Sequence, residues 1–402
     1  MSDTKILGLS ELRAARREMR SLFWAAGFFS IFVNLLMLTG PLFMLQTYDR
    51  VLGARSESTL VALFAVVAFL YLIMGIVDWA RGRLLTRMGA GFQARLERRV
   101  FEAMIKKAST DPQPDDNSTM GHQLRDLDAL QRFYASSVFS ALFDAPWAPI
   151  FLFGMILFHP WLGGLAIFGG GVLILSAVLN QVFTKTSSVK AATAGYKSER
   201  YSDQLQNEAE TIRSLGMQTH AFEKWSKTRQ SAAHQSTRAA DMGGSFSAVS
   251  KTFRQFLQSA MLGLGAYLVL RGELTPGVMI AASILLSRAL APVEMVVNQW
   301  TTVQRAKRGW DDLVTLLSEV REDPKPLELP RPQARLEVQQ ITVIPPKGTQ
   351  ATLRLVSFSI LPGEAVGVIG PSGSGKSTLA RSLTGIWPLA GGKIRLNGAH
   401  GG

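Results

Sequence analysis

The 402-residue chain contains no cysteine, which excludes a disulfide framework and any metal or redox site that depends on thiolates. Charged residues are also scarce. They make up 18% of the chain, whereas hydrophobic residues make up 47%. This balance is too apolar for an ordinary soluble enzyme and indicates a membrane protein with room for two or more domains.

The charge that is present is mostly positive, with 43 lysines and arginines against 30 acidic residues. The basic residues are spread through polar segments between apolar runs, and acidic residues are interleaved with them. Cytoplasmic loops facing anionic lipid explain this distribution better than a nucleic-acid surface does. We therefore expect membrane lipid, and no nucleic acid, among the partners.

Six apolar stretches are long enough to cross a bilayer. The run 145–184 carries no full charge and holds two of them, because His159 and Pro160 break it at the middle. The expected spans are residues 21–48, 59–77, the two halves of 145–184, 251–270 and 274–293.

Six spans place both termini on one side of the membrane. The connections on the opposite side contain only three basic residues, Arg50, Arg55 and Arg271, so the positive-inside rule places the termini in the cytoplasm. The two long connections on the cytoplasmic side, 78–134 and 185–250, have helical patterns in their interiors. We expect the spans to continue into the cytoplasm as long helices that return to the membrane.

Turn-forming residues at 111–118 mark the tip of the first connection. The segment after it, Gly121 to Leu130, either docks against a cytoplasmic domain or simply begins the returning helix. The N-terminal segment 1–20 also allows two interpretations. Its apolar residues recur at helical spacing after Ser10, a candidate N-cap, and the helix either lies on the membrane surface or is a solvated lead-in.

Two charges, Arg288 and Glu294, interrupt the sixth span. A charge inside a membrane is a functional hypothesis by default. Because both residues fall near the cytoplasmic boundary, snorkelling or the lining of a cavity is favoured over substrate recognition.

A proline-rich linker at 321–334 follows a helical stretch at 310–320. Beyond it, residues 335–343 and 351–360 are rich in β-forming residues and are expected to pair as a hairpin, with a further short strand at 393–396.

One stretch specifies a chemistry, because it matches the G-x-x-x-x-G-K-[ST] pattern of phosphate-binding loops. Its glycines let backbone N–H groups approach phosphates, Lys376 adds a positive charge near the outer phosphates, and Ser377 offers a hydroxyl to Mg²⁺. The apolar run 364–369 is expected to be a buried strand and 377–383 a helix start, the order that the motif requires. The predicted nucleotide-binding residues are Gly370, Pro371, Ser372, Gly373, Ser374, Gly375, Lys376, Ser377 and Thr378, with Ser377 as metal ligand and no catalytic residue assigned.

The chain resembles ABC exporters, and specifically the permease/ATPase family of bacterial type I protein secretion. The phosphate loop contributes to this resemblance, but four other stretches are more diagnostic: YDRVL at 48–52, FDAPWAPI at 143–150, HPWL at 159–162 and SRALAPVE at 287–294. The resemblance extends from about Ser21 to the end of the sequence.

The resemblance implies a mainly α fold. The expected parts are an N-terminal helix at 1–20, a six-helix ABC exporter transmembrane domain with long cytoplasmic extensions at 21–320, the linker at 321–334, and an incomplete α/β nucleotide-binding domain at 335–402. It further implies that segments 121–130 and 209–223 are coupling regions that transmit movement of the nucleotide-binding domain to the spans.

The resemblance also implies an ATPase of the bacterial inner membrane that uses ATP and Mg²⁺ and works as a homodimer. The implied partners are a periplasmic adaptor and an outer-membrane channel, and the implied substrate is a polypeptide with a C-terminal secretion signal. An exporter of lipids or small molecules and a truncated, non-catalytic membrane subunit remain alternative functions.

Two departures from the family pattern qualify the expected activity. Val343, Ile344 and Pro345 stand where many relatives place an aromatic residue against adenine, and no Asp or Glu follows Glu364. The chain therefore lacks the family's Mg²⁺-binding Asp and catalytic Glu, as well as its γ-phosphate-sensing Gln, signature loop and switch His. Residues 389–393 faintly resemble the signature loop but are interpreted as a turn. Because phosphoryl transfer requires positioned metal and base groups, we expect this truncated member not to hydrolyse ATP by itself.

Overall fold

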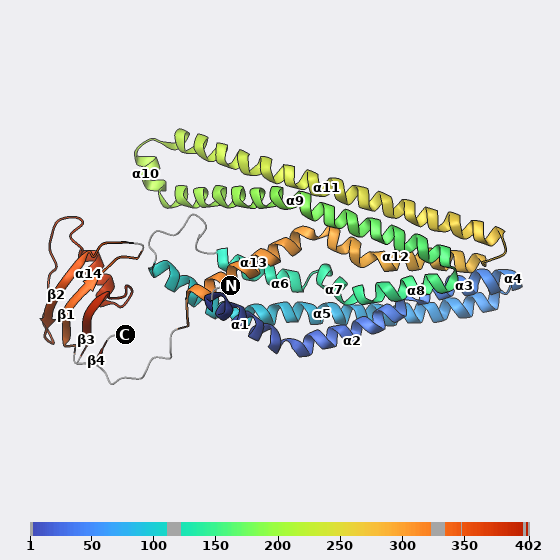
Figure 1. Ribbon diagram of the computed structural model, residues 1–402, viewed down its shortest axis with the longest axis horizontal. Helices are drawn as coiled ribbons and strands as arrows, with labels where there is room; N and C mark the ends of the chain where they lie inside the picture. Colours follow the sequence, from blue (N-terminus) through green and yellow to red (C-terminus); the bar gives the residue numbers. More distant parts are fainter. Residues whose placement is uncertain (1–2, 111–121, 323–333, 347, 397–398, 401–402) are drawn as a thin grey trace. The chain divides into compact units, whose positions relative to one another are not determined.

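The computed structural model describes residues 3–110, 122–322, 334–346, 348–396 and 399–400. The chain divides into two compact units. The larger comprises residues 12–96 and 125–311, and the smaller comprises residues 1–11, 97–124 and 312–402. The described residues of the larger unit form helices and short turns, whereas the smaller unit also contains a β-sheet (Figure 1).

The helices follow the apolar and helical patterns of the sequence. They are α1 (Asp3–Glu18), α2 (Arg20–Met37), α3 (Thr39–Gln46), the π-helical η1 (Thr47–Val51), α4 (Leu52–Ala54), α5 (Glu57–Thr110), α6 (His122–Tyr134), α7 (Ser137–Asp144), the 3₁₀ turn η2 (Ala145–Trp147), α8 (Ala148–Phe158), α9 (Pro160–Asn207), α10 (Ala209–Ser214), α11 (Gln218–Leu270), α12 (Pro276–Asn298), α13 (Trp300–Glu319) and α14 (Lys376–Leu383).

The predicted break between the third and fourth spans is confirmed. Helix α8 ends at Phe158, His159 is extended, and α9 begins at Pro160. Proline suits the first helical position because its missing N–H would have no helical partner there. The Nδ1 atom of His159 accepts a hydrogen bond from the N–H of Trp161 (3.3 Å), which caps the new helix.

Within the described residues, five helical segments are long and apolar enough to cross a membrane: Arg20–Ala54, Glu57–Ser109, Ser137–Phe158, Pro160–Asn207 and Pro276–Asn298. The stretch expected as the fifth span, 251–270, forms the end of α11, and no part of α11 reaches the same hydropathy. Polar side chains such as Arg254, Gln255 and Gln258 lower its hydropathy.

Helix α11 nevertheless returns to the same end of the larger unit as the other outward turns. The carboxylate of Asp49 in η1 accepts hydrogen bonds from Thr275 Oγ1 (2.6 Å) and the Gly277 N–H (2.9 Å) at the start of α12. Glu273 also lies 3.2 Å from the imidazole of His159, between α8 and α9. The three predicted outward turns therefore lie together at one end of the larger unit.

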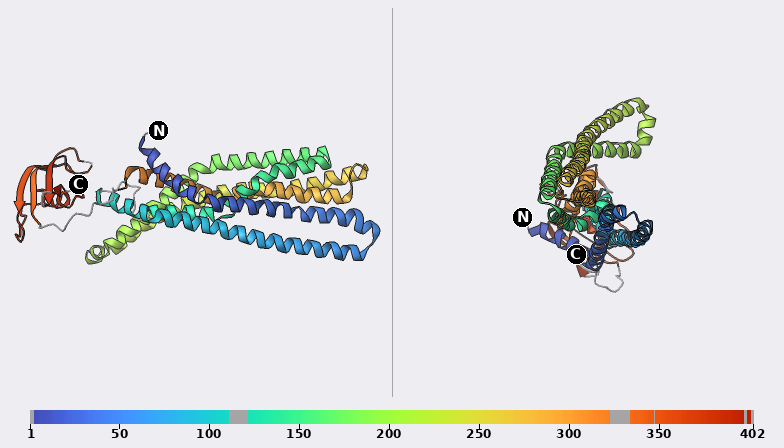
Figure 2. Two further views of the ribbon diagram at one scale, coloured as in Figure 1. Left: turned by 90° about the horizontal axis from the view of Figure 1, so that it is seen from below. Right: turned by 90° about the vertical axis from the view of Figure 1, so that its right-hand side faces the viewer.

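Three helices are far longer than a bilayer requires. Helix α5 has 54 residues, α9 has 48 and α11 has 53. At 1.5 Å per residue each is about 70 to 80 Å long, against roughly 30 Å of hydrocarbon. Figure 1 and Figure 2 show α10 joining α9 and α11 at the tip of their long hairpin. The predicted helical extensions are confirmed.

The apolar core of the larger unit lies between α8, α9, α11 and α12. Its fully buried side chains include Met155, Leu162, Leu257, Met261 and Leu286. By contrast, the most apolar part of α5 has no buried residue. That part of α5 turns its side chains outward, as expected of a surface in contact with lipid.

The N-terminal helix differs from the prediction at its start. Helix α1 begins at Asp3, so Ser10 is not its N-cap, and the Ser10 hydroxyl instead donates to the carbonyl of Leu7 (2.7 Å). Leu12 and Ala15 are buried. The apolar face of α1 is therefore covered by protein, which fits neither a helix lying on lipid nor a fully solvated one.

The smaller unit contains a four-stranded antiparallel sheet in the order β2-β1-β3-β4. Strands β1 (Leu336–Val343) and β2 (Leu353–Ile360) confirm the predicted hairpin, β3 (Gly391–Leu396) confirms the short strand, and β4 (Ala399–His400) follows it. The core beside the sheet consists of Val338, Ile341, Val343, Leu353, Trp387 and Ile394, with Leu379 and Leu383 of α14 packed against it.

The prediction of a buried strand at 364–369 is wrong. These residues form no strand, and their apolar side chains are exposed, including 94% of Ile369. A buried strand requires neighbours that bond its backbone and cover both faces. None of the four described strands pairs with this segment, so its apolar sequence has nothing to pack into. The predicted tip at 111–118 and most of the linker, 323–333, lie outside the described residues.

Because the chain has no cysteine, its topology is directly testable with single introduced thiols. Arg271→Cys, in the α11–α12 turn, is expected to react with a membrane-impermeant maleimide in intact spheroplasts. Gln218→Cys, at the exposed start of α11, is expected to react only after permeabilisation. Labelling of Gln218→Cys in intact spheroplasts would contradict the predicted orientation.

Candidate functional site

The phosphate loop lies in the smaller unit, between the exposed segment 364–369 and α14. Gly373 has φ of 83° and Gly375, which caps α14, has φ of 92°. Side chains are strained at such angles. A Cβ atom on Gly375 would also lie 2.9 Å from Leu353 Cδ2 on β2. The glycine of the motif is therefore required both by the turn and by the close approach of the strand.

The lysine of the loop folds back onto it. Lys376 Nζ donates to the carbonyl oxygens of Gly370 (2.7 Å) and Pro371 (2.8 Å). The first helical backbone bond of α14 runs from Leu379 N to Gly375 O (2.9 Å), so the N–H groups of residues 376–378 precede the helical pattern. Free N–H groups at a helix start together with a lysine ammonium are the donors that a phosphate group requires.

This donor set fits a nucleotide phosphate chain, but the loop offers few ligands to Mg²⁺. Ser377 supplies a hydroxyl, and residues 365–402 contain no carboxylate side chain. Among the described residues no group of three or more His, Asp or Glu side chains gathers as a metal site.

Near the loop, Trp387 is buried in the core, and the guanidinium of Arg381 lies over its ring at 4.8 Å. Trp387 is thus a core residue and not a platform for a base.

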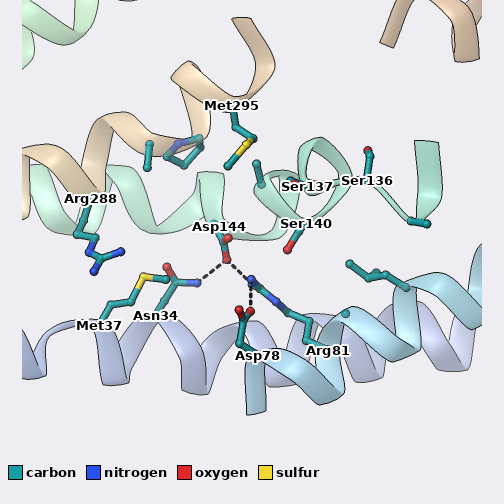
Figure 3. Close-up of a pocket in the computed structure, with 16 residues that line it drawn as sticks. Asn34, Met37, Asp78, Arg81, Ser136, Ser137, Ser140, Asp144, Arg288 and Met295 are labelled. Carbon is teal, nitrogen blue, oxygen red and sulfur yellow. Dashed lines mark hydrogen bonds and ion pairs between the residues drawn. The ribbon is translucent and has the colours of Figure 1, made fainter. Parts of the chain in front are cut away.

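A second polar site lies inside the larger unit, where a single carboxylate oxygen joins three helices. Asp144 Oδ1, at the end of α7, accepts hydrogen bonds from Asn34 Nδ2 and Arg81 Nη1, each at 2.7 Å (Figure 3). It also accepts one from Ser30 Oγ at 2.7 Å. Arg81 Nη2 also donates to Asp78 Oδ1 at 2.7 Å. The Arg81 side chain is only 7% exposed, so its charge depends on these two carboxylates.

Local sequence explains how these groups meet. Ser30 and Asn34 are one turn apart on α2 and share a face. Asp78 and Arg81 stand one turn apart on α5, directly after the uncharged run. Asp144 ends α7 because Pro146 follows in the 3₁₀ turn η2. Asp144 is part of the FDAPWAPI stretch singled out by the sequence, whereas Arg81 was not predicted as a site residue. The adjacent carboxylate and guanidinium after an apolar run were the signal for it.

The network forms part of the wall of a cavity of about 400 Å³ among α2, α5, α7 and α12. Arg288 of α12 also lines it, with Met37 and Met295 nearby (Figure 3). In the described part of the chain, Arg288 has no hydrogen-bond or ion-pair partner. Pro292 lies four residues later inside α12 and has no N–H for the Arg288 carbonyl. The interpretation of Arg288 as a cavity-lining residue is confirmed.

Glu294, the second charge of that span, lies elsewhere. Its carboxylate is 3.2 Å from Arg254 Nε on α11, and both side chains are about a quarter exposed. Glu294 therefore contributes an ion pair between α11 and α12 and does not line the cavity around Arg81.

The two predicted coupling segments adopt different structures. Residues 209–223 form α10, a turn with Gly216 at φ 65°, and the start of α11. The described part of 121–130 belongs to α6, which packs against α5 through a hydrogen bond from Gln93 Nε2 to Asp128 Oδ1 (3.0 Å). This segment therefore begins the returning helix.

The fold and these two sites define a class of protein: a multi-pass helical membrane domain joined to a phosphate-loop segment. Residues 23–292 match the family model for the ABC transporter transmembrane region, and residues 353–401 match a second family model, described as ABC transporter. The chain belongs to the ABC transporter family, whose members use ATP and Mg²⁺.

The relatives of this chain include bacterial secretion and toxin-translocation ATP-binding proteins. The chain is 39% identical over 386 residues to the type I secretion system ATP-binding protein PrsD of Rhizobium meliloti, covering 96% of this chain and 66% of PrsD. It is 26% identical to the toxin RTX-I translocation ATP-binding protein of Actinobacillus pleuropneumoniae, covering 92% of this chain and 52% of that protein. It is 24% identical to the leukotoxin translocation ATP-binding protein LktB of Mannheimia glucosida, covering 94% and 54% respectively.

The chain thus spans between about half and two thirds of the length of these relatives. The predicted resemblance to the type I secretion family is confirmed. A bacterial Atm1-family ABC exporter with ATP bound matches the structure with a TM-score of 0.76 at 16% identity, over 95% of this chain and 68% of that one. That likeness confirms the predicted ABC exporter fold.

The Arg81–Asp144 pair is testable as a buried charge pair. Asp144→Leu leaves the Arg81 guanidinium without its main partner and is expected to cost about 3 to 5 kcal/mol of stability. The double variant Arg81→Leu/Asp144→Leu is expected to recover most of that loss, because no unpaired charge remains. Thermal unfolding in detergent measures both.

Glu294→Leu is the matched control, since it breaks a partly exposed pair and is expected to cost no more than about 1 kcal/mol. Equal losses of stability in Asp144→Leu and Glu294→Leu would contradict the proposed role of the buried pair. So would a double variant Arg81→Leu/Asp144→Leu that is less stable than Asp144→Leu alone.

Proposed function

We propose that this chain is the inner-membrane subunit of a bacterial type I secretion system, in which ATP binding and hydrolysis drive polypeptide export. The observation that carries the proposal is the 39% identity to PrsD over 96% of the chain. The order of a long-helix membrane domain before a phosphate loop supports it.

In this proposal, residues 21–320 are the transmembrane domain and 335–402 the nucleotide-binding part, with 1–20 and 321–334 as N-terminal helix and linker. Both termini are cytoplasmic. The subunit works as a homodimer with a periplasmic adaptor and an outer-membrane channel, and its substrate is a polypeptide with a C-terminal secretion signal. The names of the relatives that mention RTX-I toxin and leukotoxin support a polypeptide substrate.

The nucleotide site of the proposal is the loop Gly370 to Thr378. Mg²⁺-ATP supplies the phosphoanhydride bond whose cleavage drives transport. Lys376, which donates to two carbonyl oxygens in this structure, would donate to phosphate oxygens instead, and the N–H groups of 376–378 would donate to the same phosphate chain. Ser377 offers its hydroxyl to the metal. Cleavage further requires a carboxylate that positions Mg²⁺ and one that activates water, and residues 365–402 contain neither.

We therefore expect the purified 402-residue protein to bind ATP without hydrolysing it. Lys376→Ala is expected to weaken binding of a fluorescent ATP analogue by at least tenfold, because the charge-assisted bonds to phosphate are lost. Lys393→Ala, on β3, is the matched control and is expected to bind like the unaltered protein. Phosphate release by the unaltered protein that is abolished in Lys376→Ala would contradict the expected lack of hydrolysis. Equal binding of the ATP analogue by Lys376→Ala and Lys393→Ala would show that the loop is not the nucleotide site.

The proposed interaction with a periplasmic adaptor can be tested with a cross-linker placed in one of the outward turns. A photo-cross-linking residue at Arg55, beside α4, is expected to capture the periplasmic adaptor when the two proteins are produced together. The same group at Gln218 serves as the control and is expected to capture none. Absence of adaptor at Arg55, combined with nucleotide-dependent lipid or drug movement in vesicles containing a full-length relative, would favour the alternative exporter function.

A further inference from the structure

A pocket of about 580 Å³ lies in the larger unit where α1 meets α2, apart from both sites described above. Its floor is apolar and aromatic, formed by residues of α2, α5, α6 and α7, and its rim carries four arginines. The floor residues are Phe23, Trp24, Met88, Phe92, Tyr134 and Phe139, and the rim residues are Arg13, Arg16, Arg17 and Arg20.

The four rim arginines are exposed, and within the described residues none of them has a hydrogen-bond or ion-pair partner. Two acidic residues of α1 are already paired. Glu11 accepts from Arg99 Nε at 3.1 Å, and Glu18 pairs with Arg95, both on α5. The fold therefore turns Glu11 and Glu18 toward α5 and leaves four positive charges around one pocket.

The floor is built to hold an apolar group. The Phe92 and Met88 side chains are at most 3% exposed. The Tyr134 ring packs against Phe92 and Phe139, with ring centroids 5.3 Å and 5.0 Å apart. Burial raises the pKa of the Tyr134 phenol, and the positive charge of Arg16 opposes that shift. The phenol thus remains a protonated donor close to the arginine rim.

The position of the pocket indicates what reaches it. Arg20 begins α2, whose residues from Leu22 onward are almost entirely apolar, and Trp24 is 67% exposed. A row of arginines followed by an exposed tryptophan at the start of a span is typical of the boundary between the cytoplasm and the bilayer. Arginine binds phosphate in a bidentate geometry, and anionic lipids gather at that boundary.

We propose that this pocket binds one anionic phospholipid of the cytoplasmic leaflet, with its phosphate on the arginine rim and part of an acyl chain on the aromatic floor. A free phosphate would leave the floor unused, and an uncharged lipid would leave the rim unpaired. The choice of leaflet rests on the cytoplasmic N-terminus of the proposed function. The pocket itself does not depend on transport.

Native mass spectrometry of the purified full chain in detergent, titrated with phosphatidylglycerol, tests the proposal without any transport assay. Each rim arginine near an anionic lipid contributes about a fivefold gain in affinity. Arg16→Gln/Arg20→Gln is therefore expected to weaken the first phosphatidylglycerol binding step about 25-fold. Arg213→Gln/Arg238→Gln, which changes two exposed arginines of α10 and α11, is the matched control and is expected to leave that step unchanged.

Two further measurements complete the test. Trp24→Ser, an exposed position, is expected to weaken binding of a two-chain lipid but not of a short-chain phosphate ester. Phosphatidylcholine is expected to bind at least tenfold more weakly than phosphatidylglycerol. Equal binding of the two lipids, displacement of lipid by millimolar inorganic phosphate or ATP, displacement by an acidic peptide, or equal effects of the two arginine pairs would overturn the proposal. Lipid binding that meets these expectations, together with equal ATP binding by Lys376→Ala and Lys393→Ala, would instead overturn the nucleotide site of the proposed function.

Discussion

The burial of Arg81 against Asp144 is the constraint on which the helical unit depends. A guanidinium that is almost fully removed from water is stable only when carboxylates and hydrogen bonds replace its solvation. Asp144, Asp78 and Ser30 provide that replacement from three separate helices. Any movement of α2, α5 or α7 that separates these groups exposes an unpaired charge to an apolar interior, so the three helices are held as a set.

The same charge pair also helps to set the polarity of the neighbouring cavity. The charged network lies beside a cavity of about 400 Å³, separate from the apolar core between α8, α9, α11 and α12. The cavity is lined on one side by the paired Arg81 and on the other by Arg288, which lacks a partner among the described residues. A cavity with one satisfied and one unsatisfied guanidinium attracts anionic or strongly polar groups, whereas the core beside it excludes them.

The proposed lipid pocket follows from a different use of arginine. Arg95 and Arg99 of α5 pair with the acids of α1, which fixes the helix and leaves its own arginines facing outward. In the smaller unit, Lys376 satisfies its charge with two carbonyl oxygens of its own loop. Basic side chains thus occupy three different environments in this protein. Arg81 is buried against carboxylates, the rim arginines are exposed around an aromatic floor, and Lys376 donates to carbonyl oxygens whose place phosphate oxygens can take.

The sequence predicted features that depend on neighbours in the chain. A proline fits the first position of a helix, and uncharged runs of bilayer length form helices, so the break at His159 and the apolar spans followed directly from the sequence. The hairpin of β1 and β2 was also predictable from β-forming residues around a turn. The failures have one origin. Residues 364–369 are apolar, yet a strand exists only where other strands accept its hydrogen bonds. Residues 251–270 fall short of the hydropathy of the other spans, and the position of their outward end follows from contacts of the next turn with Asp49 and His159.

The sequence by itself determined that this is a membrane protein of the ABC exporter type with a phosphate loop. Glycine spacing, hydropathy and proline positions act over one or two turns of chain. Only the tertiary structure decided that Asp144 meets an arginine 63 residues away, that Arg288 faces a cavity while Glu294 does not, and that four arginines of α1 and α2 surround an aromatic floor. Charge pairing acts through space, so it is set by the packing of helices rather than by the order of residues along them.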